Sequence, residues 1–392
     1  MASPYIKRYV MTAGPTPIPP EVSNAMAEPI LYHRAPAFVE VYARTLQRLK
    51  MVFQTENEVL TFAASGSGAM ESAVANLVKP GEPALVASAG KFGERWAELC
   101  DDFGAQTIHW ESGWGNKIDP AELERKLAEN EGVEVVFTTL SETSTGVVHD
   151  IQALTEVAHA AGALIVVDAV SGLGAVPIPQ DEWGVDVVVS GSQKALMCPP
   201  GLAFASANEA ALERAASIPG RRHYFDWQAT LKGQRKDPPD SPFTPAVTLF
   251  VALDVALGMI EEEGLEQVFE RHRLLGNATR AATKALELDL YGPEDENSNV
   301  VTAIQLPESV DGAKVPKTMR DKYGITIAGG QGKLKGKIAR IAHCGYFGPF
   351  DMITTLSAFE MTLRELGHDL ELGTGVGAAQ AVFLEAGVPV AA

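Results

Sequence analysis

Residues 187–207, VVVSGSQKALMCPPGLAFASA, contain one charged side chain, Lys194, which comes directly after an apolar strand pattern. Most lysines in proteins are solvated surface charges. The neighbours of Lys194 are small or apolar, so we expect its ammonium group to be partly removed from water and its pKa to be lowered. A lysine with a lowered pKa suits carbonyl chemistry through a Schiff base. The stretch therefore predicts either an ordinary surface lysine or a reactive one.

An acidic residue has the corresponding position after a second apolar run. In residues 161–180, AGALIVVDAVSGLGAVPIPQ, Asp168 is the only charged residue. A carboxylate there is either a buried, hydrogen-bonded structural acid or the partner of a cation. Pyridoxal phosphate enzymes need both kinds of group, because the lysine holds the cofactor aldehyde and the acid keeps the ring nitrogen protonated. The two runs together point to that chemistry.

Apolar runs alternate with helical patterns through the first half of the chain. The predicted strands are residues 58–64, 83–88, 133–139, 163–168 and 185–190, and the predicted helices start near 69, run through 94–101 and span 151–161. Strands covered on both faces have such apolar sequences. Alternation of strands and helices predicts an α/β fold with a mostly parallel, doubly wound sheet. Ligands of such sheets bind at the carboxyl ends of the strands.

The pattern changes after about residue 245. Two long helical patterns span residues 249–263 and 265–286. A strand–helix–strand–helix region follows, with its elements at residues 301–305, 313–323, 337–342 and 350–366. We therefore predict a large domain of residues 23–265 and a smaller α+β C-terminal domain of residues 266–392.

Composition and charge exclude several classes of protein. The chain has 392 residues, 46% of them hydrophobic, and a formal net charge of −18. The negative charge disfavours nucleic acid and anionic membranes as partners. The stretch 161–180 is interrupted by a charge, glycines and prolines, so no membrane span is expected. The three cysteines are scattered, so they form no disulfide framework, and we expect no metal site. The first 20 residues lack the apolar run of a signal peptide, and we therefore predict a cytoplasmic protein.

A third motif lies between a predicted strand and a predicted helix. Residues 64–71, ASGSGAME, place glycines where backbone N–H groups can approach an anion, and serine hydroxyls add further donors. The motif is neither a Walker loop nor Gly-x-Gly-x-x-Gly. Because glycine–serine turns are common, it does not identify a phosphate site by itself. Phe92 follows the next strand, and it is either a core aromatic or a side chain that stacks on a planar ring.

Five motifs together resemble class V aminotransferases, in the same order along the chain. They are TAGPTPIPPEV (12–22), AASGSGAMES (63–72), ETSTGVVHD (142–150), VVDAVSGLG (166–174) and SGSQKALMCPPG (190–201). The group most similar to this chain comprises the alanine–glyoxylate, serine–glyoxylate and serine–pyruvate aminotransferases. The resemblance extends from about Tyr9 to the C-terminus. It implies fold type I, pyridoxal 5'-phosphate as cofactor, and ping-pong transfer from alanine or serine to glyoxylate or pyruvate.

The resemblance also implies roles for individual residues. Lys194 matches the Schiff-base lysine, Asp168 the partner of the pyridinium nitrogen, Phe92 the stacking aromatic and Thr143 a polar residue near the ring 3-hydroxyl. Arg340 matches the arginine that holds the substrate carboxylate.

Further matches concern the phosphate and the second subunit of a homodimer with shared active sites. The N-terminal segment 1–22, which includes Gly14, matches a part near the substrate and the dimer interface. Phosphate-side contacts are implied for Ser65, Gly66, Ser67 and Gln193, and contacts across the dimer interface for Ser241 and Thr244.

Three alternatives to this interpretation remain open. Another class V transaminase would use aspartate or ureidoglycine as donor. A cysteine desulfurase would want a histidine at the position of Phe92 and a cysteine on a mobile loop, where this chain offers Cys344 near a strand end. An accessory protein that only kept the fold has no need of Lys194 and Asp168. The segment 32–34, Tyr-His-Arg, resembles parts near the substrate, but His33 and Arg34 receive no definite role.

Overall fold

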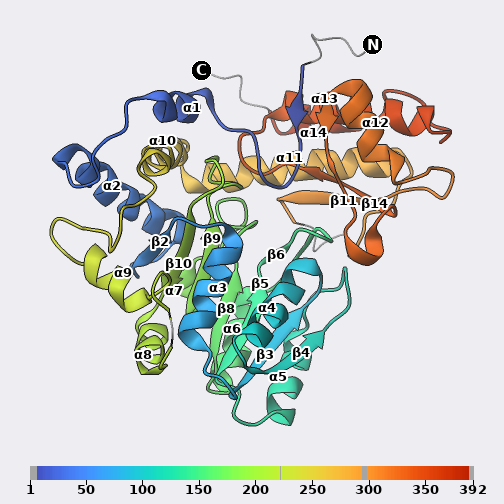
Figure 1. Cartoon of the computed structure of the whole chain (residues 1–392). Coiled ribbons are helices and arrows are strands. Elements are labelled where there is room, and N and C mark those ends of the chain that lie inside the picture. Colours follow the sequence, from blue (N-terminus) through green and yellow to red (C-terminus); the bar gives the residue numbers. More distant parts are fainter. Residues whose placement is uncertain (1–6, 221, 294–297, 388–392) are drawn as a thin grey trace.

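The computed structural model describes residues 7–220, 222–293 and 298–387, so residues 1–6 of the predicted N-terminal segment lie outside it (Figure 1). Within this part of the chain, a seven-stranded sheet has the order β2-β10-β9-β8-β5-β3-β4. Its strands are β2 (Val59–Phe62), β3 (Pro83–Ser88), β4 (Gln106–Glu111), β5 (Val135–Thr139), β8 (Leu164–Asp168), β9 (Val187–Gly191) and β10 (Ala203–Ala207). The five strands from β9 to β4 are parallel, and β10 is antiparallel to both of its neighbours. The predicted mostly parallel sheet is confirmed.

Two strands of the sheet were not expected from the sequence. Strand β4 lies at the edge and is half exposed, so its sequence QTIHWE is largely polar and lacks the apolar run of a covered strand. Strand β10 is fully buried, but its sequence AFASA has small residues where β-branched ones usually mark a strand.

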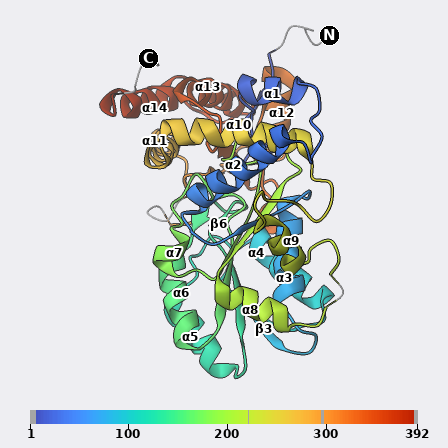
Figure 2. The same ribbon diagram turned by 90° about the vertical axis from the view of Figure 1, so that its left-hand side faces the viewer.

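Helices cover both faces of the sheet (Figure 2). One face carries α5 (Pro120–Glu129), α6 (Ile151–Ala160) and α7 (Gln180–Trp183), and the other α3 (Gly66–Leu77), α4 (Lys91–Asp102), α8 (Glu209–Ser217) and α9 (Trp227–Gln234). Val136 of β5 packs in one apolar cluster, whereas Val135 and Phe137 pack in a second one. Successive side chains of a strand point to opposite faces, so these clusters are the two cores of a doubly wound fold.

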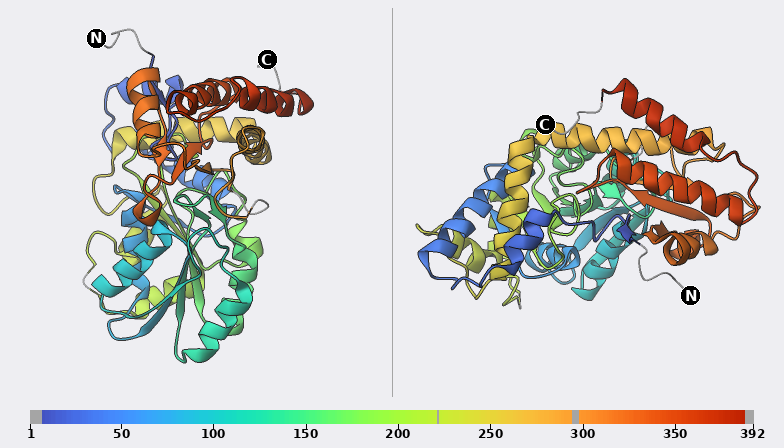
Figure 3. Two further views of the ribbon diagram at one scale, coloured as in Figure 1. Left: turned by 90° about the vertical axis from the view of Figure 1, so that its right-hand side faces the viewer. Right: turned by 90° about the horizontal axis from the view of Figure 1, so that it is seen from above.

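The C-terminal part forms a smaller α+β unit. Its three-stranded antiparallel sheet has the order β11-β14-β13, and helices pack on it. Helix α10 (Val247–Glu263) precedes this unit, whose elements are α11 (Leu265–Ala285), β11 (Val301–Gln305), α12 (Lys314–Tyr323), β13 (Ala328–Gly329), the 3-10 helix η2 (Gly332–Leu334), β14 (Ile338–Ala342), α13 (Pro349–Glu365) and α14 (Thr374–Glu385). Helix α14, which was not expected, runs beside α11 (Figure 3). The exact domain boundaries stay a prediction.

The N-terminal segment links the two units. Strand β1 (Tyr9–Val10) pairs in parallel with β12 (Ile325–Thr326) of the smaller unit. The carbonyl of Met11 then accepts a hydrogen bond from the N–H of Ala342 at 3.2 Å. After a turn the chain continues into α1 (Pro20–Ala27) and α2 (Pro36–Phe53) on the large unit. Residues 11–16 are thereby held between the small sheet and the loop that follows β9.

Candidate active site

The polar residues singled out in the sequence follow neighbouring strands of the large sheet. Strand β9 leads into Lys194, β8 ends at Asp168, and β3 leads into Phe92. Strand β5 leads into the short hairpin of β6 (Ser141–Glu142) and β7 (Val147–Val148), which carries Thr143. Parallel strands end at the same edge of a sheet, so these groups converge there.

Lys194 is buried, with 8% of its surface exposed. Its amino group donates a hydrogen bond to the carbonyl oxygen of Ala13, and the hydroxyl of Thr16 donates to the carbonyl of Lys194 at 2.9 Å. Burial lowers the pKa of Lys194, an effect that Cys344 and the carboxylate of Asp168 oppose. The buried amine thus has the lowered basicity that carbonyl chemistry requires.

Gly14 lies directly against the Lys194 side chain. A Cβ atom at Gly14 would stand 2.3 Å from the Cε of Lys194, and the residue has a φ of +114°. Both the space and the backbone conformation therefore call for glycine. The predicted place of Gly14 near the substrate stays a prediction.

Asp168 is buried at the end of β8, with 4% exposure. One oxygen accepts a hydrogen bond from the N–H of Val170 at 2.8 Å. Burial raises the pKa of Asp168 to about 6, and the charge of Glu142 adds to this, while the Val170 hydrogen bond and Lys194 oppose it. A buried acid without an ion pair in the described residues favours a cationic partner, such as a protonated ring nitrogen.

Arg340 is held firmly on β14. Its Nε donates to the carbonyl of Gly329 at 2.9 Å and its Nη1 to the carbonyl of Thr143 at 2.8 Å. Burial lowers the pKa of Arg340, and the charge of Glu142 opposes this. The two bonds orient the guanidinium plane and use two of its five N–H groups, so three can meet a carboxylate. The Thr143 hydroxyl shares a hydrogen bond of 2.6 Å with Ser171.

The N-terminus of α3 forms a cradle that suits a phosphate. The helix begins at Gly66, three residues earlier than expected, so Ser65 is its N-cap and its side chain makes no capping hydrogen bond. A Cβ at Gly191 would lie 2.9 Å from Gln193 Oε1 and 3.2 Å from the N–H nitrogen of Gly66. Among the described residues, the buried Oε1 of Gln193 has no hydrogen-bond partner. Free N–H groups and the hydroxyl of the neighbouring Ser67 fit a phosphate group, to which Gln193 could donate only through its amide NH2 group.

Ser241 and Thr244 lie in a surface loop. Ser241 donates a hydrogen bond to the carbonyl of Phe243, Thr244 is exposed, and no contact between this loop and Lys194 is seen within the described chain. Arg34 is exposed as well, and its charge acts on Asp240 of the same loop. The predicted contacts of Ser241 and Thr244 across a dimer interface stay predictions, and Arg34 still has no definite role.

Two residues of this region, Arg95 and Glu142, were not predicted from the sequence as site residues. Arg95 donates from Nη1 to the hydroxyl of Ser67 at 2.9 Å, and its guanidinium lies 5.3 Å from the ring centre of Phe92. Other charges surround Arg95 in the sequence, so no local pattern marks it. Glu142 is fully buried, and it is the only charge in residues 135–148. The same pattern that marked Asp168 marks Glu142 as well.

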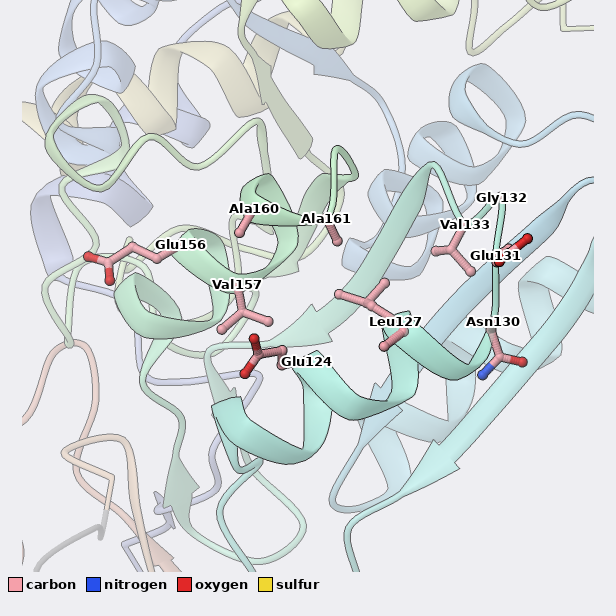
Figure 4. A pocket seen from close by; sticks show the side chains of 11 residues that line it. Glu124, Leu127, Asn130, Glu131, Gly132, Val133, Glu156, Val157, Ala160 and Ala161 are labelled. Carbon is pink, nitrogen blue, oxygen red and sulfur yellow. The ribbon is translucent and has the colours of Figure 1, made fainter.

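A surface depression drawn in Figure 4 lies elsewhere on the large unit. It has a volume of 640 Å³ and is lined by residues of α5, α6 and the turn before β5, among them Leu127, Val133 and Val157. These residues belong to the amino-end edge of the sheet. The depression is therefore separate from the converging groups at the carboxyl ends.

The family comparison agrees with the geometry. The family described as aminotransferase class-V matches residues 8–340. The chain belongs to the class V aminotransferases. This confirms the resemblance noted in the sequence, and it identifies an enzyme that transfers amino groups with pyridoxal phosphate as cofactor. Lys194, Asp168 and the N-terminus of α3 have the chemistry that the aldehyde, ring nitrogen and phosphate of this cofactor would need, and their individual roles stay predictions.

Similar proteins cover nearly the whole chain. A protein of Synechococcus sp. (strain PCC 6716), the small subunit of a soluble hydrogenase, is 43% identical over 96% of this chain and 98% of its own length. The serine–glyoxylate aminotransferase of Methylorubrum extorquens is 36% identical over 97% of this chain and 96% of that protein. The crystal structure of ureidoglycine–glyoxylate aminotransferase from Bacillus subtilis has a TM-score of 0.92 and 31% identity, and it covers 98% of this chain and 99% of that one.

In the described ranges, no helix combines the length and apolar character that crossing a membrane requires. The same residues include no group of three or more His, Cys, Asp or Glu side chains placed to hold a metal ion.

Proposed function

We propose that this enzyme transfers the amino group of a small amino acid, alanine or serine, to glyoxylate or pyruvate by a ping-pong mechanism. The observation that carries the proposal is the meeting of buried Lys194, buried Asp168 and an oriented Arg340 at one edge of the sheet. These supply an amine, an acid and a carboxylate-binding cation. The names of the Methylorubrum and Bacillus relatives support glyoxylate as the acceptor.

Each group has a definite task in this mechanism. Bound pyridoxal phosphate supplies an aldehyde that takes up the amino group and a ring that accepts electrons. With the cofactor bound, the amino group of Lys194, with its lowered pKa, would accept the proton from the substrate Cα and hold it on Nζ for the next step. Asp168 stabilises the positive charge on the ring nitrogen. The second half-reaction reverses these steps with the oxo acid, which makes the kinetics ping-pong.

Arg340 selects the α-carboxylate that all these substrates share. A planar guanidinium accommodates a carboxylate through two parallel N–H···O bonds. Its hydrogen bonds to Gly329 and Thr143 hold it in place before the substrate arrives. With the carboxylate bound, the Cα–H bond of the amino acid is directed towards Lys194.

The proposal includes a cytoplasmic homodimer with shared active sites. Hydroxyl donors from a second subunit would add to the N–H groups that the N-terminus of α3 offers to the phosphate. The exposed Thr244 and the neighbouring Ser241 offer hydroxyl groups at the surface, where they suit the site of a second subunit. The three cysteines are all buried free thiols, which agrees with a reducing compartment.

A subunit of a larger complex without catalysis is the second candidate, which the hydrogenase-subunit relative favours. Such a role places no demand on Lys194, Asp168 and Arg340, whose convergence supports the enzyme instead. A cysteine desulfurase is disfavoured because Cys344 is fully buried and burial raises the pKa of its thiol to about 11. A nucleophilic cysteine is an exposed thiolate.

The test is a single-turnover experiment on the purified protein with pyridoxal phosphate. Alanine, serine, aspartate and ureidoglycine are added separately, and the visible absorbance of the bound cofactor is followed. We expect alanine and serine to convert it fastest, and glyoxylate or pyruvate to restore the starting spectrum. Faster conversion by aspartate or ureidoglycine would replace the proposed donor. A protein that shows no visible cofactor band would instead support the accessory role.

A further inference from the structure

Glu142 is a buried carboxylate that the proposed mechanism does not use. Its side chain is 0% exposed, and its carboxylate accepts hydrogen bonds from Ser144, Phe92 and Gly93. Burial raises its pKa, while hydrogen bonds from Ser144, Gly93 and Phe92 act in the opposite direction. A charged group is kept in such a place only where several donors replace its hydration.

The two oxygens of Glu142 join two separate elements of the active site. Oε2 accepts hydrogen bonds from the N–H groups of Phe92 at 3.1 Å and Gly93 at 2.9 Å, in the first turn of α4. Oε1 accepts from the N–H of Ser144 at 3.0 Å and from its hydroxyl at 2.6 Å, in the β6–β7 hairpin. The hydroxyl of Ser144 accepts in turn from the N–H of Lys91 at 3.0 Å.

The start of α4 is shaped around this carboxylate. Its N-cap, Gly90, has no side chain to satisfy the first N–H groups. A Cβ atom at Gly90 would lie 2.4 Å from the Cγ of Glu142 and 2.5 Å from the hydroxyl of Ser144. Glu142 therefore caps the helix from a distant part of the chain. Its negative charge also interacts favourably with the helix dipole.

Both elements that Glu142 joins carry residues placed at the cofactor ring. Phe92 is itself one of the hydrogen-bonded residues, and Thr143 stands between Glu142 and Ser144 in the chain. The carbonyl of Thr143 accepts the hydrogen bond that orients Arg340. A shift of the hairpin relative to α4 would therefore change the spacing of the ring contacts and the direction of the guanidinium.

We propose that Glu142 is a positioning residue, which fixes Phe92 on α4 and Thr143 on the hairpin at the spacing that the cofactor ring requires. This inference rests on the proposed function. It also predicts that glutamine cannot replace Glu142, because every partner of the carboxylate is a donor. The NH2 group of glutamine would face two of these donors and lose their hydrogen bonds.

The test compares Glu142→Gln with Glu360→Gln, which is a matched control. Glu360 is also buried, with 1% exposure, and its carboxylate accepts from the N–H groups of Gly373 and Val376 at the start of α14, away from the site. Both substitutions remove a helix-capping charge of the same kind. The readouts are the dissociation constant of pyridoxal phosphate, the visible circular dichroism per bound cofactor, the half-reaction with alanine and the melting temperature.

We expect both variants to melt at lower temperature, and only Glu142→Gln to bind the cofactor about tenfold or more weakly, as the loss of hydrogen bonds to a charged group implies. Its visible circular dichroism should fall to half or less, because a loosely held ring has no single orientation. Ser144→Ala removes the hydroxyl that donates to Glu142 and accepts from Lys91, while the N–H donors of Phe92, Gly93 and Ser144 remain. It should give a weaker change of the same kind, and it tests the inference if Glu142→Gln does not fold.

A Glu142→Gln or Ser144→Ala protein with the cofactor affinity and dichroism of the wild type would overturn the inference, whatever its melting temperature. Equal changes in Glu360→Gln would do the same, since they would show a general loss of stability. These outcomes differ from a failure of the proposed function, in which the wild-type protein itself would bind no cofactor or convert no amino acid.

Discussion

Replacing Asp168 by asparagine should stabilise the cofactor-free protein while it lowers the activity of the enzyme. The pKa of Asp168 is raised from 3.8 to about 6 in the folded chain, chiefly by burial. The folded protein thus binds a proton that the unfolded chain releases between these values. The stabilising effect of the neutral acid is complete below pH 3.8, and it is lost as the pH rises through 6.

The size of the effect follows from this shift. Two pKa units correspond to ~3 kcal/mol, which is the cost of holding the charged carboxylate in the folded protein at pH 8. Asparagine carries no charge, and its amide oxygen can still accept the hydrogen bond from Val170. We therefore expect the free energy of unfolding of the Asp168→Asn protein to exceed that of the wild type by ~3 kcal/mol at pH 8 and by less than ~1 kcal/mol at pH 4.

Urea unfolding of the two cofactor-free proteins, followed by tryptophan fluorescence at equal protein concentration, measures this difference. Asp186→Asn is the control, because Asp186 is equally buried but accepts hydrogen bonds from His159, Ile165 and Asn208. That variant should be less stable than the wild type at both pH values. The reasoning is refuted if Asp168→Asn gains no stability at pH 8, or gains the same amount at pH 4.

The same variant should lose more than about tenfold in turnover, equal to ~1.4 kcal/mol in the chemical step, because the ring nitrogen loses its charged partner. Saturating pyridoxal phosphate should also reduce or reverse its stability advantage, since the cofactor then pairs with the carboxylate of the wild type. A variant that keeps more than a tenth of the rate would show that Asp168 is only structural.

Three other substitutions test the remaining groups. Lys194→Ala should abolish transamination and still retain part of the cofactor after gel filtration; turnover at the wild-type rate would overturn the assignment of Lys194. Arg340→Lys should lose ~2–3 kcal/mol of charge-assisted hydrogen bonding, or about 30- to 150-fold in kcat/KM, for every donor and acceptor alike. A loss confined to one substrate would make Arg340 a side-chain specificity residue. Gly14→Ala should slow the half-reaction with alanine by about tenfold or more, because its Cβ would stand 2.3 Å from the Cε of Lys194; an unchanged single-turnover rate would contradict this.

Much of the fold could be predicted because burial leaves a local pattern. The apolar runs located the covered strands, and β3 and β11 have the predicted boundaries. Strand β4 was not predicted, because an edge strand faces solvent and can therefore contain polar residues, which interrupt the apolar pattern. The start of α3 was placed too late, because glycines and serines lower helix propensity while they suit a helix N-terminus.

The sequence by itself marked Lys194 and Asp168 as candidates for the chemistry of the site, and the resemblance to class V aminotransferases supplied their predicted roles. Lys194 and Asp168 are each the only charge beside an apolar strand pattern. Such a charge is expected to be partly buried, and a buried charge is retained where it has a partner or a function. Glu142 has the same signature, but only the structure shows that its partners are the N–H groups of α4 and of Ser144.

The tertiary structure decided which of these groups meet. The strands that carry the site, β3, β5, β8 and β9, are direct neighbours in the sheet, although long crossover segments separate them along the chain. The contacts between Lys194 and Ala13 and between Arg340 and Thr143 span 181 and 197 positions. Local patterns report whether a residue is buried, whereas contacts over such separations depend on how the sheet and the smaller unit close around one another. For that reason, the candidate reactive groups could be predicted from local sequence patterns, whereas their spacing is set only by tertiary contacts in the folded chain.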